Sequence, residues 1–112
     1  MREISQICAE KRICRIAKVK GIGYGRNKEG ELFIGPDDDY CLVGKYSAKE
    51  EAPEMEFYWD REKSPSFTIS LSEDDAFIAN ILEYMYECTT YNKIHDTMAI
   101  IALKDILKGA YV

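Results

Sequence analysis

The stretch between residues 15 and 26 combines basic side chains with alternating glycines, a composition suited to holding an anion. Gly21, Gly23 and Gly25 could form a tight turn whose backbone N–H groups cradle a phosphate. Lysines and arginines around the glycines supply positive charge, and Tyr24 offers a surface on which a base could stack. The sequence thus predicts a site for an anionic small molecule, such as a nucleotide. Its expected residues are Arg15, Lys18, Lys20, Gly21, Gly23, Tyr24, Gly25 and Arg26.

The same glycines have a structural interpretation that competes with ligand binding. Their spacing departs from the dinucleotide-binding fingerprint and from the Walker loop, and no helix obviously follows them to add its dipole. A bulged or twisted strand would use glycine at these positions without any ligand. The basic side chains could likewise pair inside the sheet, with Glu54, Glu56 or Asp60 on neighbouring strands.

Charge is unevenly divided along the chain, whose formal net charge is −5. Residues 1–28 hold eight bases and two acids (+6), whereas residues 29–112 hold seven bases and eighteen acids (−11). The acidic remainder would repel a long nucleic-acid duplex, so we do not expect one as a partner. It would complement a basic groove on a protein, and tyrosine is enriched at such contacts. The predicted protein-binding residues are Asp37, Asp38, Asp39, Glu83, Tyr84 and Glu87.

Neither a metal site nor a catalytic site is predicted. The run from Asp37 to Asp39 lacks the alternating ligands and the late glutamate of an EF-hand, so a solvated turn is expected, with no metal and no cofactor. His95 and Asp96 could act with Cys88 as base and nucleophile. These residues flank a predicted helix break and have no identifiable oxyanion hole, so we do not expect an enzyme.

The chain is expected to be cytoplasmic, because charged residues interrupt its beginning and no apolar run reaches the roughly 20 residues of a membrane span. Its four cysteines form no C-x-x-C pair, and a single histidine could complete a zinc site, so we expect reduced and mostly buried thiols. The length of 112 residues suits one domain covering residues 1–112.

The expected fold is α+β, with a mostly antiparallel sheet between one short N-terminal helix and two C-terminal helices. A marginal helix is predicted at 3–10 from its apolar spacing. Alternation, β-branched residues and turn signals predict about five strands, at 12–20, 31–34, 40–46, 55–59 and 67–71. Ser72 and the acids after it predict a helix from 72 to 88, which residues 89–92 break before a second helix at 93–108.

The last predicted helix carries an apolar run at 98–103 that extends around most of its surface. Such a helix either lies at the centre of the fold or is covered by another subunit, so we expect a homodimer or larger homo-oligomer through it. The leading functional expectation is a non-catalytic protein that sequesters or blocks a ligand or partner. Phage and mobile-element inhibitors of host defence systems are commonly of this type. A structural subunit of a larger complex and a small enzyme using His95 are the alternatives.

Overall fold

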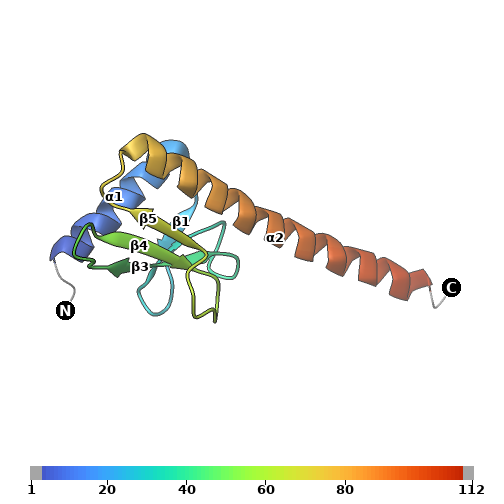
Figure 1. The fold of residues 1–112 in the computed structure, drawn as a ribbon. Coiled ribbons are helices and arrows are strands. Elements are labelled where there is room, and N and C mark those ends of the chain that lie inside the picture. Colours follow the sequence, from blue (N-terminus) through green and yellow to red (C-terminus); the bar gives the residue numbers. More distant parts are fainter. Residues whose placement is uncertain (1–3, 110–112) are drawn as a thin grey trace.

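A computed structural model describes the backbone of residues 4–109 and the side chains of residues 4–102 (Figure 1). Along the chain, one helix precedes five strands and a second helix follows them. The elements are α1 (Ile4–Lys20), β1 (Tyr24–Arg26), β2 (Leu32–Ile34), β3 (Leu42–Ser47), β4 (Glu54–Tyr58), β5 (Phe67–Ser70) and α2 (Asp75–Gly109). The five-stranded antiparallel sheet and the α+β class are therefore confirmed, while the prediction of two C-terminal helices is wrong.

The sheet is a meander in which each strand pairs antiparallel with the next strand along the chain. Both helices lie on one face of this sheet (Figure 1). Alternation along β4 buries Met55 and Phe57 fully beneath the helices, while Glu56 and Tyr58 remain partly exposed. One buried apolar cluster joins the sheet to both helices.

Helix α1 continues through the region where a strand was predicted at 12–20. Its buried positions follow helical spacing, since Ala9, Ile13, Ile16 and Ala17 lie three or four residues apart. A strand would have placed Val19 on the same face as Ile13 and Ala17, yet Val19 is 81% exposed. The alternation of β-branched and basic residues was thus compatible with both patterns, and packing against the sheet selected the helix.

Gly21 ends α1 in a left-handed conformation, with φ of 69°. Its N–H donates to the carbonyl of Lys18 over 3.2 Å, and the N–H of Ile22 donates to the carbonyl of Ala17 over 2.9 Å. This hydrogen-bond pair is a Schellman motif, which favours glycine because a side chain strains the left-handed backbone. The chain then turns directly into β1.

Helix α2 is one element of 35 residues, and no break occurs at 89–92. Asp74 caps its start by accepting a 2.8 Å hydrogen bond from the N–H of Phe77, whereas the predicted cap, Ser72, bonds to Ser70. Thr89 stays helical because its side chain is fully buried and its hydroxyl donates to the carbonyl of Tyr86. Packing thus overrides the weak helix propensity of the two threonines.

The second half of α2 extends beyond the sheet (Figure 1). Among the described residues, Thr89 is the last buried residue of the helix, and Lys93 and Asp96 are the last side chains that bond to the rest of the fold. Residues 91–102 are all exposed apart from Lys93, so the apolar run at 98–103 is not central in this chain over its described part. We call residues 4–96 the head.

Candidate functional site

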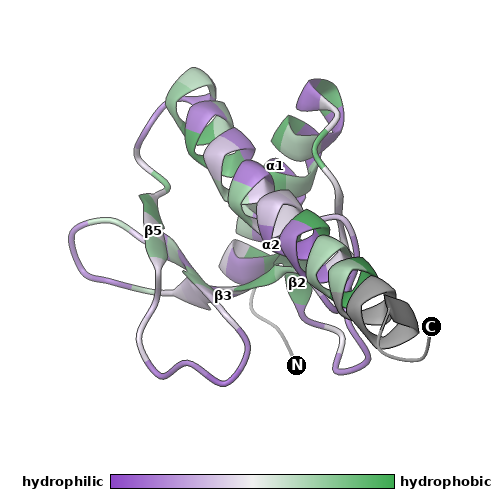
Figure 2. Ribbon diagram, turned by 90° about the vertical axis from the view of Figure 1, so that its right-hand side faces the viewer, coloured by the Kyte–Doolittle hydropathy of each residue, from purple (hydrophilic) through white to green (hydrophobic). Residues whose placement is uncertain are grey.

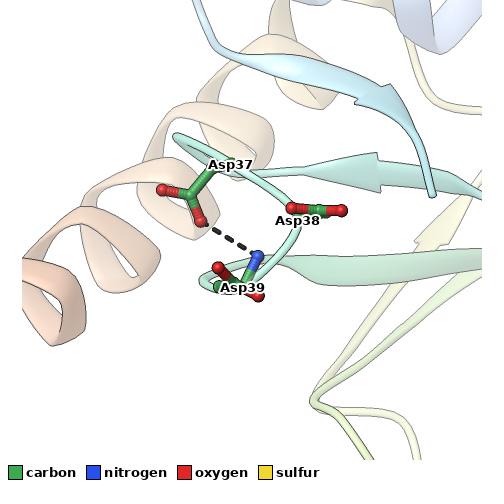
Figure 3. A group of neighbouring side chains, drawn as sticks. All are labelled: Asp37, Asp38 and Asp39. Atoms are coloured by element: carbon green, nitrogen blue, oxygen red, sulfur yellow. Dashed lines mark hydrogen bonds between the residues drawn. The ribbon is translucent and has the colours of Figure 1, made fainter. Parts of the chain in front are cut away.

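The turn between β2 and β3 carries the three predicted aspartates (Figure 3). Asp37 organises this turn: its Oδ1 accepts hydrogen bonds from the N–H groups of Asp39 and Tyr40, over 2.9 and 3.0 Å. Its Oδ2 lies 2.6 Å from Nζ of Lys93 on α2. The hydrogen bond from Lys93 is the main reason that the pKa of Asp37 falls below its ordinary value, and the same bond raises the pKa of Lys93.

Asp38 and Asp39 form an exposed acidic surface with residues from two other turns. Figure 3 shows Asp37 directed toward α2 and Asp38 directed away from it. Asp38 and Asp39 line a hollow of about 260 Å³ at one end of the sheet. We call this surface the acidic end, and define it by Glu29, Asp38, Asp39 and Asp60. Lys28 also lines the hollow, and Arg61 lies 3.8 Å from Asp60. The four carboxylates of the acidic end therefore outnumber the two nearby cations.

Cys41 lines the same hollow, and the negative charges around it affect the pKa of its thiol. Its pKa is raised to about 11, first by burial and then by the charges of the aspartates, with Asp38 the largest contributor and Asp60 among them. Glu29 and Asp60 were not among the predicted site residues, because hairpin geometry rather than sequence proximity brings them to Asp38. Their positions in turns directly after strands were the available signal.

Among the described residues, the three aspartates form the one group of three or more potential metal-ligating side chains in which one ligand atom from each lies within 4.8 Å of the others. Lys93 already supplies a counter-charge to Asp37. The expectation of a solvated turn without a metal stays a prediction.

The other predicted protein-binding residues lie elsewhere, on the outward face of α2. Glu83, Tyr84 and Glu87 are exposed there, although Tyr84 also borders strand β5. Tyr84 packs edge-on against Phe67, with ring centroids 5.8 Å apart. A second hollow, of about 460 Å³, is lined by Trp59, Tyr84, Glu87, Cys88, Tyr91 and Asn92. The predicted acidic surface is therefore divided between the end of the sheet and the back of α2.

The predicted anion-binding residues are also divided. Arg15 and Lys20 both line a groove of about 330 Å³ between α1 and the start of α2. Apolar residues form much of its wall, namely Ile16, Val19, Ala76 and Ala79, with Asp75 and Asn80 beside them. Oδ2 of Asp75 lies 4.0 Å from Arg15 and therefore partly neutralises it.

The glycines serve the fold at the positions where a phosphate loop was predicted. The N–H groups of Gly21 and Ile22 are occupied by the helix cap. A Cβ atom at Gly25 would lie 2.8 Å from the tip of the Phe33 ring on the paired strand, so that ring would have to shift to admit a side chain. Tyr24 is partly exposed on β1 at the sheet edge. Arg26 is held by Glu10, which is buried in α1 and also accepts a hydrogen bond from Gln6.

The alternative in which the basic residues pair with Glu54, Glu56 or Asp60 across the sheet does not fit the described ion pairs. Arg12 instead joins α1 to the start of α2: it donates to the carbonyls of Leu71 and Glu73 and to Asp75. Over the described residues, Lys18 and Lys20 have no ion-pair partner. Positive charge is thus presented by α1 and not by a strand.

Cys88 and His95 lie seven residues apart on one continuous helix, which separates them by about 10 Å along its axis. That distance exceeds hydrogen-bond reach between a nucleophile and its base. His95 is exposed, stacks against Tyr91 at 6.0 Å and lies 3.9 Å from Asp96. All four cysteines are free, but Cys8 is exposed rather than buried, and the other three are half-buried.

Comparison with known proteins gives no relative: no family model, curated protein or solved structure matches this chain. Among the described residues, no helix has the length and apolar character needed to cross a membrane.

Proposed function

We propose that this protein is a non-catalytic binding protein that blocks a basic surface on a protein partner through its acidic end. The observation that carries the proposal is the convergence of Glu29, Asp38, Asp39 and Asp60 from three separate turns around one hollow. A protein that inhibits by covering a partner's surface requires no reacting groups. An acidic surface of this kind therefore suffices for a blocking protein of the phage or mobile-element type.

Support comes first from the difference between Asp37 and its neighbours. Asp37 is occupied by Lys93, whereas Asp38 and Asp39 are exposed and form no ion pair among the described residues. Their charges are therefore free to attract lysines and arginines on a partner. Such complementarity raises the association rate and suppresses wrong partners, and it weakens as salt screens the charges.

Support also comes from the anion-binding residues, several of which are engaged within the fold. Arg26 binds Glu10, and the N–H of Gly21 is part of the helix cap. An anionic ligand at the predicted site would therefore find fewer free hydrogen-bond donors than the sequence pattern of basic residues and glycines indicated.

A charge-reversal experiment tests the proposal. Tagged protein is used to capture partners from a host lysate, in parallel with the variant Asp38→Lys/Asp39→Lys. The matched control is Glu50→Lys/Glu51→Lys, which makes the same charge change on the exposed loop between β3 and β4. We expect a basic partner that wild type and control both capture, that the Asp38/Asp39 variant loses, and that added salt releases. Equal capture by all three proteins would contradict the acidic end as the binding surface.

A second candidate function is binding of an anionic small molecule in the groove between α1 and α2. The specific observation is that Arg15 and Lys20 meet there beside the apolar side chain of Val19, in a volume within the usual range for small-molecule sites. ATP would serve as the first probe, with thermal stabilisation as the readout. We expect stabilisation of the wild type and of Lys11→Ala/Lys18→Ala, which removes the same charge outside the groove. Stabilisation that survives in Arg15→Ala/Lys20→Ala would exclude the groove.

A further inference from the structure

One face of α2 carries a line of large apolar side chains, interrupted at Asn80 and Glu87, which we call the heptad stripe. Its members are 47% to 67% exposed although they are aromatic or aliphatic. They are Phe77, Tyr84, Tyr91, Ile94, Met98 and Ile101. The stripe continues past the head onto the projecting half of the helix, which Figure 2 shows directed toward the viewer with apolar segments along it.

The spacing of the stripe is that of a coiled coil. Phe77, Tyr84, Tyr91 and Met98 recur every seven residues, and Ile94 and Ile101 follow two of them by three. These spacings correspond to the a and d positions of a heptad. In a coiled coil, each a or d side chain inserts into a space formed by four residues of the facing helix. The core-facing residues Ile78, Leu82 and Met85 lie on another face of the helix and are fully buried, and within the stripe Tyr84 touches the edge of the core through Phe67.

We infer that a second copy of this chain covers the heptad stripe, so that two α2 helices pair in an antiparallel coiled coil. A helix that leaves its own fold depends on tertiary packing for stability in water. Residues 97–102 of α2 lie past the last described contacts of the helix with the head, and all of them are exposed. A second helix with the same stripe supplies contacts from Tyr84 to Ile101, including the part of α2 that packs on the sheet.

The area available is that of a stable dimer. Five large side chains between Tyr84 and Ile101, each about half to two-thirds exposed, offer roughly 600 Å² per copy, at the lower end of the about 600 to 1,000 Å² per partner of a standard interface. Scattered apolar residues on a monomer surface do not reach this contiguous area.

Glu87 decides the direction of the pair. It occupies a d position between Tyr84 and Tyr91, and it is exposed. In a parallel pair equivalent positions face each other, so two Glu87 carboxylates would oppose one another inside the seam. In the antiparallel register Glu87 faces Met98 of the second copy, Tyr84 faces Ile101 and Tyr91 faces Ile94. Because only the parallel pair buries like charges together, the antiparallel pair is favoured.

The oligomeric state tests the inference, and it is independent of the acidic end, whose readout is partner capture. Sedimentation equilibrium over a concentration series should give a dimer for the wild type and a monomer for Met98→Glu/Ile101→Glu. Ile100→Glu is the matched control, since Ile100 is 54% exposed on the opposite face of the same projecting segment. It should leave the dimer intact. Unchanged amide resonances of the five strands would show that each variant retains the head.

Several results would overturn the inference. A wild type that stays monomeric at its highest soluble concentration would leave the stripe to another kind of partner. A trimer or larger assembly, or a dimer that Ile100→Glu disrupts as strongly as Met98→Glu/Ile101→Glu, would also reject pairing through this stripe.

Cross-linking tests the direction of the pair. In a background of Cys8→Ser/Cys88→Ser, chains carrying Tyr84→Cys are mixed with chains carrying Ile101→Cys and oxidised. We expect a covalent dimer in the mixture and little in either chain alone. Rapid cross-linking of Ile101→Cys with itself would establish a parallel pair, and no cross-link in the mixture would reject the antiparallel register.

Discussion

Lys93 donates a 2.6 Å hydrogen bond to Asp37, which ties the middle of α2 to the turn between β2 and β3. One turn further on, the hydroxyl of Tyr40 donates to Asp96 over 3.1 Å. These two contacts mark the point at which α2 leaves the head. Both originate in the same turn, so the turn that presents Asp38 and Asp39 is held in place by the helix.

Asp37→Asn should lower the thermal stability at neutral pH, because the amide can still organise the turn but carries no charge for Lys93. The pKa of Asp37 lies below its ordinary value of 3.8 in the folded protein. Its contribution is therefore fully present above 3.8 and is lost as pH falls through the lowered pKa. Melting temperatures of the two proteins should converge under strong acid and in high salt. A difference that widened on acidification would contradict this linkage.

Glu10→Ala should destabilise the protein by about 2 kcal/mol, since it removes a buried charged acceptor from Arg26 and Gln6. Glu10→Gln should cost less, because its amide oxygen can still accept from the arginine. Urea denaturation measures both changes, with Glu29→Ala on an exposed turn as the control. Equal losses for Glu10→Ala and Glu29→Ala would mean that the buried pair contributes little.

Gly21→Ala should cost about 1 kcal/mol, because a Cβ atom strains the left-handed conformation at the end of α1. The added Cβ would contact no other atom within 4 Å, so conformational strain is the whole effect. Gly21→Asn should be milder, since asparagine tolerates this conformation better. The urea midpoint of Lys20→Ala, one residue earlier in the helix, provides the comparison. An unchanged stability of Gly21→Ala would show that the end of α1 relaxes to accommodate the Cβ atom.

Cys41 should react slowly with iodoacetamide at pH 8, because a pKa of about 11 leaves roughly one thiol in a thousand ionised. The exposed Cys8 serves as the internal reference. Asp38→Asn/Asp60→Asn should accelerate Cys41 by lowering its pKa, although burial keeps the value above the ordinary 9.0. Mass spectrometry of the alkylated peptides measures both rates. Equal rates for Cys41 and Cys8 would contradict the raised pKa, and an unchanged rate of Cys41 in the double variant would contradict the contribution of the aspartates.

The strands from β2 to β5 could be predicted from sequence because turn residues bound short segments whose alternation has one interpretation. Met55 and Phe57 are the clearest case, since both are fully buried on β4 as their spacing predicted. The segment 12–20 failed because its apolar residues fit a strand and a helix equally well. The exposed Arg15 and Val19, which a strand would place on the face of Ile13 and Ala17, distinguish the two, and this burial pattern follows from contacts with distant parts of the chain.

The candidate surfaces were predicted in part for a related reason. Asp38 and Asp39 follow from local composition, but Glu29 and Asp60 join them only through the pairing of β1, β2, β3 and β4. The heptad stripe is visible in the sequence once α2 is continuous. The predicted break at 89–92 separated Tyr84 from Tyr91 and hid the repeat, because the burial of Thr89 could not be known from its type.

The meander order of the sheet also bears on how the chain folds. Every strand pairs with its neighbour in sequence, so the ladders close only short loops and should form early and fast. The contacts of Arg12 with Leu71, Glu73 and Asp75 span about sixty residues and must wait until both ends of the sheet are in place. Loss of Arg12 should therefore speed unfolding far more than it slows refolding, which places the junction of α1 and α2 late on the folding pathway.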